Sequence, residues 1–137
     1  MLDLKTEFGG RVNKRLLEDD VIWFTTVSPN GNPTPNPIWF FWDGEMIIVY
    51  SQPDSYRVRN IKQNPMVSLN LQGADALGHN VIIINGEASL NPDYKKPHPG
   101  YAAKYIKYLP AMHVTADELA AAYSIEIRVK PLKVRGE

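Results

Sequence analysis

Three basic side chains follow directly after the most aromatic part of the chain, a spacing that suits the binding of a small anion beside an apolar ring. Residues 21–56 contain all three tryptophans, eight of the fourteen aromatic side chains, and no lysine or arginine. Arg57, Arg59 and Lys62 come immediately afterwards, and basic side chains are the ones that bind phosphate. Positions two apart do not share a face of a helix, so we rank Arg57 first and Arg59, which pairs with Lys62 at i+3, second.

A short helix is expected to present these bases. Asp54 or Ser55 can cap its first turn. The start of a helix has free N–H groups and the positive end of the helix dipole, and both favour anions. We therefore expect a phosphate to meet Ser51, Ser55 and Arg57. The alternative interpretation is a solvated basic helix face with no ligand.

Alternating prolines indicate that the aromatic strand lies at an edge. The pair Asn30-Gly31 predicts a hairpin, and the returning strand has prolines at 33, 35 and 37 before the aromatic run 38–42. Because proline cannot donate to a ladder, such a stretch belongs on an edge or an irregular segment. The backbone of residues 35–39 is then free, and a planar cofactor ring could lie along it.

Other chemistries find little support in the sequence. There is no cysteine, which excludes thiolate metal sites and cysteine nucleophiles. His79, His98 and His113 lack metal-ligand spacing, and neither a nucleophile elbow nor a phosphate-binding loop motif is present. We nominate no catalytic and no metal-binding residue. When a protein offers no acid, base or nucleophile, a bound cofactor usually supplies the chemistry.

Length and charge narrow the class of protein further. The 137 residues fit one domain, 1–137, and the 15 basic and 15 acidic side chains leave no overall basic field for nucleic acid or an anionic membrane. The longest apolar runs are far short of the roughly 20 residues of a membrane span. We expect a soluble, cytoplasmic protein.

Consecutive hairpins dominate the expected secondary structure. A stripe at positions 8, 12 and 16 predicts an N-terminal helix. A second stripe at Tyr101, Tyr105 and Leu109, followed by a capping box at Thr115, predicts two helices before the last strand. The expected strands are 21–27, a strand containing 38–42, 46–50, 67–71, 81–90 and one that starts at Ile125. The fold class is therefore mainly β, a six-stranded antiparallel barrel, closed or split, with peripheral helices.

Several separated motifs carry a family resemblance. They are Ile38-Trp39-Phe40-Phe41-Trp42-Asp43-Gly44, Tyr50-Ser51-Gln52-Pro53, Arg57-Val58-Arg59-Asn60-Ile61 with Asn64-Pro65-x-Val67, and Gly86-Glu87-Ala88. Together they resemble the pyridoxamine 5′-phosphate oxidase-like, FMN-binding split-barrel superfamily. The stretches 100–105 and 122–136 are similar to the small oxidoreductases of that class that use the deazaflavin coenzyme F-420.

The resemblance implies a homodimer of split barrels with two cofactor sites at the interface. It implies that backbone of the second and third strands holds the ring, and that a basic residue after the third strand, usually lysine, holds the phosphate. Arg57 stands there in this sequence. The candidate cofactor-binding residues are Pro35, Asn36, Pro37, Ile38, Trp39, Tyr50, Ser51, Ser55, Arg57 and Arg59.

The leading hypothesis is an oxidoreductase that transfers a hydride between reduced coenzyme F-420 and a small conjugated or quinone-like substrate. An enzyme of the same fold loaded with FMN is the alternative. A non-enzymatic flavin or deazaflavin carrier, a haem-binding relative, and a barrel whose aromatic strand is only core are the remaining interpretations.

Overall fold

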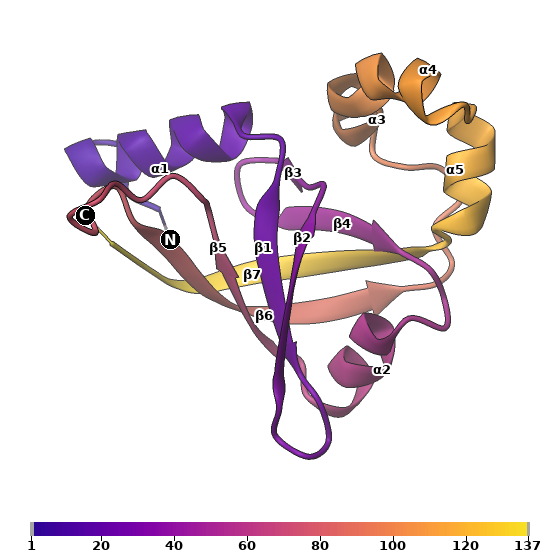
Figure 1. Cartoon of the computed structure of the whole chain (residues 1–137), viewed down its shortest axis with the longest axis horizontal. Helices are drawn as coiled ribbons and strands as arrows, with labels where there is room; N and C mark the ends of the chain where they lie inside the picture. The colour runs from indigo at the N-terminus through magenta and orange to yellow at the C-terminus, as the bar shows by residue number, and fades with distance from the viewer. Residues whose placement is uncertain (1, 137) are drawn as a thin grey trace.

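A computed structural model describes residues 2–136 as one antiparallel sheet with helices around it (Figure 1). The strands are β1 (Ile22–Val27), β2 (Pro33–Ile38), β3 (Phe41–Trp42), β4 (Ile47–Ser51), β5 (Met66–Asn70), β6 (Ile82–Asn91) and β7 (Ile125–Gly136). The helices are α1 (Glu7–Glu18), α2 (Tyr56–Gln63), α3 (Pro99–Tyr105), the 3-10 turn η1 (Ile106–Tyr108), α4 (Leu109–Met112) and α5 (Ala116–Ala122). The fold is the split barrel expected from the sequence.

The order of strands shows why the sheet must curl. Across the sheet the order is β2-β1-β5-β6-β7-β4-β3, so β2 and β3 lie at opposite edges. Only Trp39 and Phe40 separate these two strands in the sequence. A link of two residues reaches at most about 10 Å, so the two edges of the sheet must come together at this point. The sheet is thereby nearly closed, with a split between β2 and β3.

The count of six strands was wrong by one, and the reason lies at this split. The expected strand through residues 38–42 is broken at Trp39 and Phe40. The fully buried Phe40 has its N–H bonded to the hydroxyl of Tyr105, at 2.8 Å, and its carbonyl accepts from the ammonium of Lys104, at 3.0 Å. Side chains of α3 thus replace the neighbouring strand, and β2 and β3 become separate strands.

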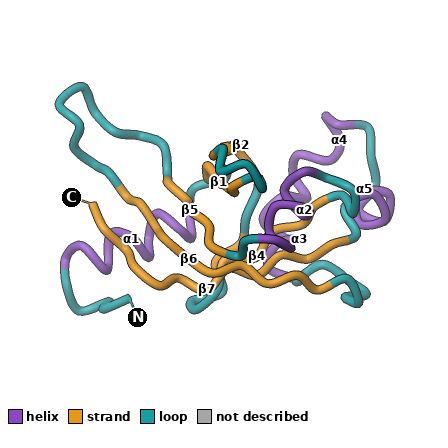
Figure 2. Tube along the Cα trace, turned by 90° about the horizontal axis from the view of Figure 1, so that it is seen from below, coloured by secondary structure: helices purple, strands orange, loops and turns teal. Residues whose placement is uncertain are grey.

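The core lies inside the curl of the sheet. Val12 and Leu16 of α1 are buried there, as the sequence stripe predicted, and Val58 and Ile61 of α2 enter the same cluster. The alternate burial of β1 and β6 shows that one face of each strand points inward. α1 covers one end of the sheet, and α3–α5 lie at the opposite end (Figure 2).

Residues 92–124, here called the insert, carry α3, η1, α4 and α5 between β6 and β7. The capping box at Thr115 is present, because its hydroxyl accepts from the Glu118 N–H and the Glu118 carboxylate accepts from the Thr115 N–H. The first expected helix is shorter than its apolar stripe, since it changes to a 3-10 turn after Tyr105. The insert forms an arch beside the sheet (Figure 1). No helix within residues 2–136 is long and apolar enough to cross a membrane.

Candidate functional site

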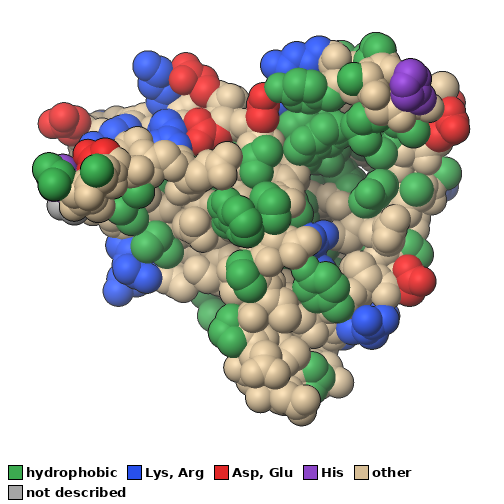
Figure 3. Space-filling model, viewed as in Figure 1, with side chains coloured by type: hydrophobic (Ala, Val, Ile, Leu, Met, Phe, Trp, Pro, Cys, Tyr) green, Lys and Arg blue, Asp and Glu red, His purple; other side chains and the backbone are tan. Residues whose placement is uncertain are grey.

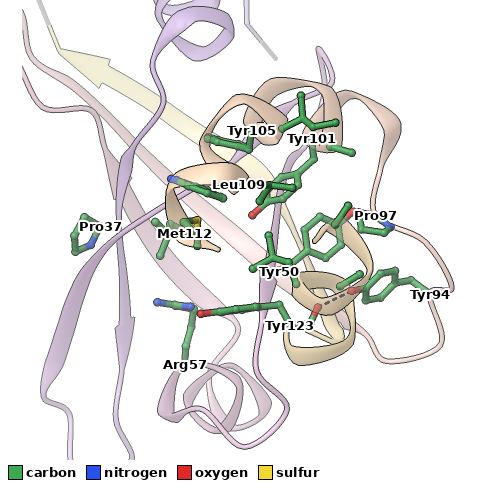
Figure 4. A pocket seen from close by; sticks show the side chains of 17 residues that line it. Pro37, Tyr50, Arg57, Tyr94, Pro97, Tyr101, Tyr105, Leu109, Met112 and Tyr123 are labelled. Atoms are coloured by element: carbon green, nitrogen blue, oxygen red, sulfur yellow. Dashed lines mark hydrogen bonds between the residues drawn. The ribbon is translucent and has the colours of Figure 1, made fainter. Parts of the chain in front are cut away.

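A cavity of about 340 Å³ opens between the insert and the sheet (Figure 3). One wall comes from the end of β2, from β4 and from α2, and the opposite wall comes from the insert (Figure 4). The lining is almost entirely apolar or aromatic, and Arg57 is the one charged residue in it. Such a slot suits a flat, largely apolar ligand that carries a single anionic group.

Tyrosines form much of the wall. The Tyr50 ring packs edge-on against Tyr101 with centroids 4.7 Å apart and lies 5.0 Å from Tyr94. Tyr105 continues the series, with its centroid 5.0 Å from that of Tyr101. These contacts bring β4 and two parts of the insert together as one aromatic surface. Aromatic pairs at such separations stabilise one another beyond their buried area.

Trp39 lies where β2 ends at the split. Its ring stacks on Tyr105, with centroids 4.4 Å apart and planes 8° from parallel, and lies 5.8 Å from Tyr108. The hydroxyl of Tyr105 bonds Phe40 on one side and donates to the Asp20 carbonyl, at 2.6 Å. The orientation of Trp39 is therefore fixed by α3, and the remaining part of its ring faces the cavity.

The Arg57 side chain contacts the sheet on one side and lines the cavity on the other. Its Nη1 donates to the hydroxyl of Ser51 at 2.7 Å, and the guanidinium lies over the Phe24 ring. Burial lowers the pKa of Arg57, and the neighbouring Tyr56 and Tyr123 raise it in part. None of the ion pairs within residues 2–136 includes Arg57. A half-buried guanidinium without a carboxylate partner is a favourable binding site for an anionic ligand, because the contact is charge-assisted and compensates a partly desolvated charge.

A buried polar network supports the tyrosine wall from behind. Tyr50 donates to the Glu126 carboxylate at 2.8 Å and accepts from the His98 N–H at 2.7 Å. Glu126 is only 2% exposed, and its other oxygen accepts from Arg128 at 2.6 Å. Burial raises the pKa of Tyr50, and the bonded carboxylate adds to the shift, whereas the His98 N–H opposes it. The Tyr50 hydroxyl therefore already donates one hydrogen bond and accepts another within the protein, and we assign it no role in proton transfer.

The open edge of β2 has an unusual hydrogen-bonding character. β2 pairs only with β1, and Pro33, Pro35 and Pro37 have no N–H to give. The ladder must therefore use Thr34, Asn36 and Ile38, because the N–H and C=O of one residue point to the same side of an antiparallel strand. The three proline carbonyls point outward, so the free edge offers acceptors without donors. Pro37 is the one of them that lines the cavity.

The structure brings together five of the ten residues proposed from the sequence. Pro37, Ile38, Trp39, Tyr50 and Arg57 all line the cavity. The other five do not line it and have different surroundings, which are described next.

Ser51 is fully buried and contacts the cavity only through Arg57. The Ser55 hydroxyl caps α2 by accepting from the Val58 N–H, at 3.3 Å. Arg59 is exposed and donates to the Asp54 carbonyl, at 2.8 Å. Pro35 and Asn36 are exposed on β2 outside the cavity lining.

Sequence reasoning missed the contribution of the insert. Its residues make up more than half of the lining: Tyr94, Pro97, Tyr101, Ala102, Tyr105, Ile106, Leu109, Met112, Ala116, Leu119, Ala120 and Tyr123. The stripe at 101, 105 and 109 predicts a peripheral helix and not a cavity wall. The signal that could have found it is the tyrosine content, since five of the seven tyrosines line this one cavity.

No histidine lines the cavity. His98 caps α3 by accepting from the Gly100 N–H, at 3.0 Å, and its ring stacks on Phe41. His113 ends α4 in a left-handed conformation, and His79 lies 3.5 Å from Asp75 in a loop. Within residues 2–136 there is no group of three or more His, Cys, Asp or Glu side chains that could hold a metal ion.

Comparison with known proteins agrees with the fold described above. The family model described as pyridoxamine 5′-phosphate oxidase matches residues 9–136. No protein of curated function matches the sequence. A solved structure of an F-420 reductase is 26% identical with a TM-score of 0.68, and the match covers 90% of this chain and 96% of that one.

Two more distant structures share the fold. An FAD-binding protein from Mesorhizobium loti is 16% identical with a TM-score of 0.65, over 90% of this chain and 89% of the other. The heme storage protein HutZ from Vibrio cholerae is 16% identical with a TM-score of 0.64, over 93% of this chain and 92% of the other. Relatives of one fold therefore bind different ring-shaped cofactors.

Proposed function

The chain belongs to the pyridoxamine 5′-phosphate oxidase family, and on that premise we propose that it is an oxidoreductase that uses coenzyme F-420. The reaction would transfer a hydride from the reduced deazaflavin to a small conjugated or quinone-like substrate. The same fold loaded with FMN is the alternative, because both cofactors combine a tricyclic ring with a ribityl phosphate. The likeness to an F-420 reductase at 26% identity supports the deazaflavin.

The observation that carries the proposal is the placement of Arg57. It is the one charged residue of an aromatic slot, and it has no carboxylate partner within residues 2–136. A ring in the slot would contact tyrosines and Trp39, and its phosphate would meet the guanidinium. Ser51 would act through Arg57 by orienting it. The residues present therefore fit a phosphorylated, planar cofactor.

The free edge of β2 offers a hydrogen-bond acceptor for such a ring. The ring of a flavin or deazaflavin carries an imide N–H, which needs an acceptor when it leaves water. Pro37 lines the cavity, and its carbonyl, which is left unpaired by β1, would be such an acceptor. The apolar walls would exclude water from the ring. The cofactor would supply the hydride, and the proton would come from solvent, since the Tyr50 hydroxyl is already bonded to Glu126.

We also propose that two copies of the chain assemble as a homodimer with the cofactor sites at the interface. Support comes from the exposed stretch Pro35–Pro37 at the edge of the sheet, which ends in the cavity lining at Pro37 and has proline carbonyls that do not pair with β1. A non-enzymatic haem-binding role is disfavoured, because no histidine lines the cavity.

Turnover tests the proposed activity. Reduced coenzyme F-420 and a naphthoquinone are mixed with the protein, and oxidation of the deazaflavin is followed by its absorbance. We expect a rate above that of the protein-free reaction, with two electrons and two protons converting the quinone to its hydroquinone. Arg57→Ala should raise the KM for the cofactor about 10- to 100-fold, because a charge-assisted contact is lost. Arg59→Ala is the matched control and should leave the KM unchanged. A rate equal to the protein-free reaction would contradict the proposal.

A further inference from the structure

A second polar group faces the position of the expected phosphate, and it comes from the insert. Tyr123 lines the cavity and follows directly after α5. Its hydroxyl and the guanidinium of Arg57 point toward each other across the cavity (Figure 4). We propose, resting on the proposed function, that Tyr123 and Arg57 bind the same phosphate group. The cofactor phosphate would then connect the insert to α2.

Arg57 is held through its side chain, and Tyr123 is held through its backbone. Arg57 is braced by Ser51 and by the Phe24 ring. The backbone of Tyr123 is held at two atoms, since its N–H donates to Leu119 at 2.9 Å and its carbonyl accepts from the Tyr94 hydroxyl at 2.5 Å. Because the carbonyl end of a helix repels anions, the bond from Tyr94 also makes this end of α5 less unfavourable for a phosphate. The guanidinium of Arg57 and the backbone that carries the Tyr123 ring are therefore held by contacts within the protein.

The chemistry of the pair suits a phosphate. A guanidinium supplies charge and several N–H donors, and a phenol can donate one more hydrogen bond to a phosphate oxygen without neutralising the cation. A carboxylate at the place of Tyr123 would instead pair with Arg57 and exclude the anion. Tyr56 also lies close enough to raise the pKa of Arg57, but it does not line the cavity.

A phosphate shared by Arg57 and Tyr123 would also affect how firmly the insert is held to the rest of the protein. No residue of α5 is buried, and Tyr123 itself is 37% exposed. Helix α5 therefore lacks a packed apolar face that would hold it to the sheet on its own. A phosphate bound to both Arg57 and Tyr123 would add a polar link between α5 and α2. A ligand with the same ring but no phosphate would not.

Paired ligands test this inference. FMN and riboflavin share one ring and differ only by the phosphate, whereas coenzyme F-420 differs from its phosphate-free chromophore by the phosphate together with the tail attached to it, so the FMN pair is the cleaner test. The dissociation constants are measured for the wild type, Tyr123→Phe and Arg57→Ala. We expect Tyr123→Phe to weaken the phosphorylated ligand of each pair about tenfold and to leave the phosphate-free ligand unchanged. In the Arg57→Ala background, Tyr123→Phe should have a much smaller effect.

The matched control is Tyr101→Phe, which removes a hydroxyl from the same cavity at a position on α3. It should change the two ligands of a pair by the same factor. If Tyr123→Phe also weakens both ligands equally, or weakens neither, Tyr123 does not bind the phosphate and the inference is overturned.

Inorganic phosphate separates this inference from the proposed function. It tests the anion site with no ring present, by the NMR shifts of the Tyr123 ring. Shifts in the wild type that vanish in Arg57→Ala would support the shared site even if neither cofactor pair binds. If none of the cofactors binds and phosphate leaves Tyr123 unshifted, both the function and the inference fail. If the cofactors bind but phosphate and Tyr123→Phe have no effect, only the inference fails.

Discussion

At the scale of single residues, the site combines one half-buried charge with side chains whose hydrogen bonds stabilise the fold. Arg57 is the charged group in the cavity lining, whereas Tyr50 and Tyr105 use their hydroxyls to hold Glu126 and the backbone at Phe40. Lys104 is another side chain whose contacts stabilise the fold. Its ammonium donates to the Phe40 carbonyl and lies 3.9 Å from the centroid of the Phe40 ring.

The titration of Lys104 gives a prediction with a definite sign. Burial lowers the pKa of Lys104 from 10.5 to about 8, although Asp20 and Asp19 favour the charge and Lys107 opposes it. Between about pH 8 and 10.5 the unfolded chain then binds more protons at this residue than the folded chain. Stability contributed by Lys104 therefore rises with pH across this window.

The measurement compares the free energy of unfolding of the wild type and Lys104→Met at several pH values, because ionisation of the tyrosines affects both proteins and cancels in the difference. The stability of the wild type relative to the variant should increase from pH 8 toward 10.5. A difference that stays flat or falls across this range would show that Lys104 is charged and solvated in the folded protein.

At the scale of elements, the split between β2 and β3 depends on α3. The Tyr105 side chain is 2% exposed, and its hydroxyl bonds the Phe40 N–H and the Asp20 carbonyl. Tyr105→Phe leaves these buried groups without a partner and should destabilise the fold by about 1–3 kcal/mol. Denaturant unfolding measures this loss.

Tyr101→Phe is the matched control, since this tyrosine lies on the same helix and its hydroxyl makes no hydrogen bond within the described residues. We expect it to change the free energy of unfolding by less than about 0.5 kcal/mol. Equal effects of the two variants would mean that the hydroxyl of Tyr105 does not hold the split.

The sequence predicted the elements whose signals are local. The apolar stripe of α1, the Ser55 cap of α2, the capping box at Thr115 and the turn at Gly31, which has a positive φ, all occur as expected. The break at Trp39 could not be predicted, because the residues that satisfy Phe40 lie more than sixty positions away. The cavity could not be predicted for the same reason. Its second wall comes from the insert, which is distant in the sequence from β2 and α2.

The residues of the candidate site also differ in how far the sequence could predict their roles. The charge of Arg57 and the prolines of β2 were visible in the sequence, because residue type alone determines them. The burial of Ser51 and the orientation of Arg59 toward Asp54 depend on how β4 and α2 meet. Tyr123 lies in the stretch 122–136 that carries the family resemblance, but its sequence gives no sign of a ligand contact, and only the folding of the insert brings it near Arg57 (Figure 4).

At the scale of the whole molecule, a chain with no net charge places one positive side chain, that of Arg57, in the lining of its aromatic cavity. The formal net charge is zero, yet the cavity lining has a positive charge and no negative one. This arrangement suits one small anion and disfavours a polyanion. The open edge of β2 borders the same region, which is why we propose that a second copy covers it.

The dimer makes a simple hydrodynamic prediction. Sedimentation equilibrium should give about twice the chain mass of 15.5 kDa, because we propose that a second copy covers the exposed edge of β2. Addition of cofactor should strengthen the association if the sites lie at the interface. A mass of one chain at micromolar concentration, with and without cofactor, would contradict the dimer and leave the single-chain cavity as the binding site.

The most direct test of the central claim is an equilibrium titration of the purified protein with coenzyme F-420 and with FMN, followed by tryptophan fluorescence. Trp39 is the tryptophan that lines the cavity, so a ring bound there should quench its emission. We predict micromolar or tighter binding of at least one cofactor, weakened about 10- to 100-fold by Arg57→Ala and unaffected by Arg59→Ala. Micromolar binding of neither cofactor would contradict the proposed function.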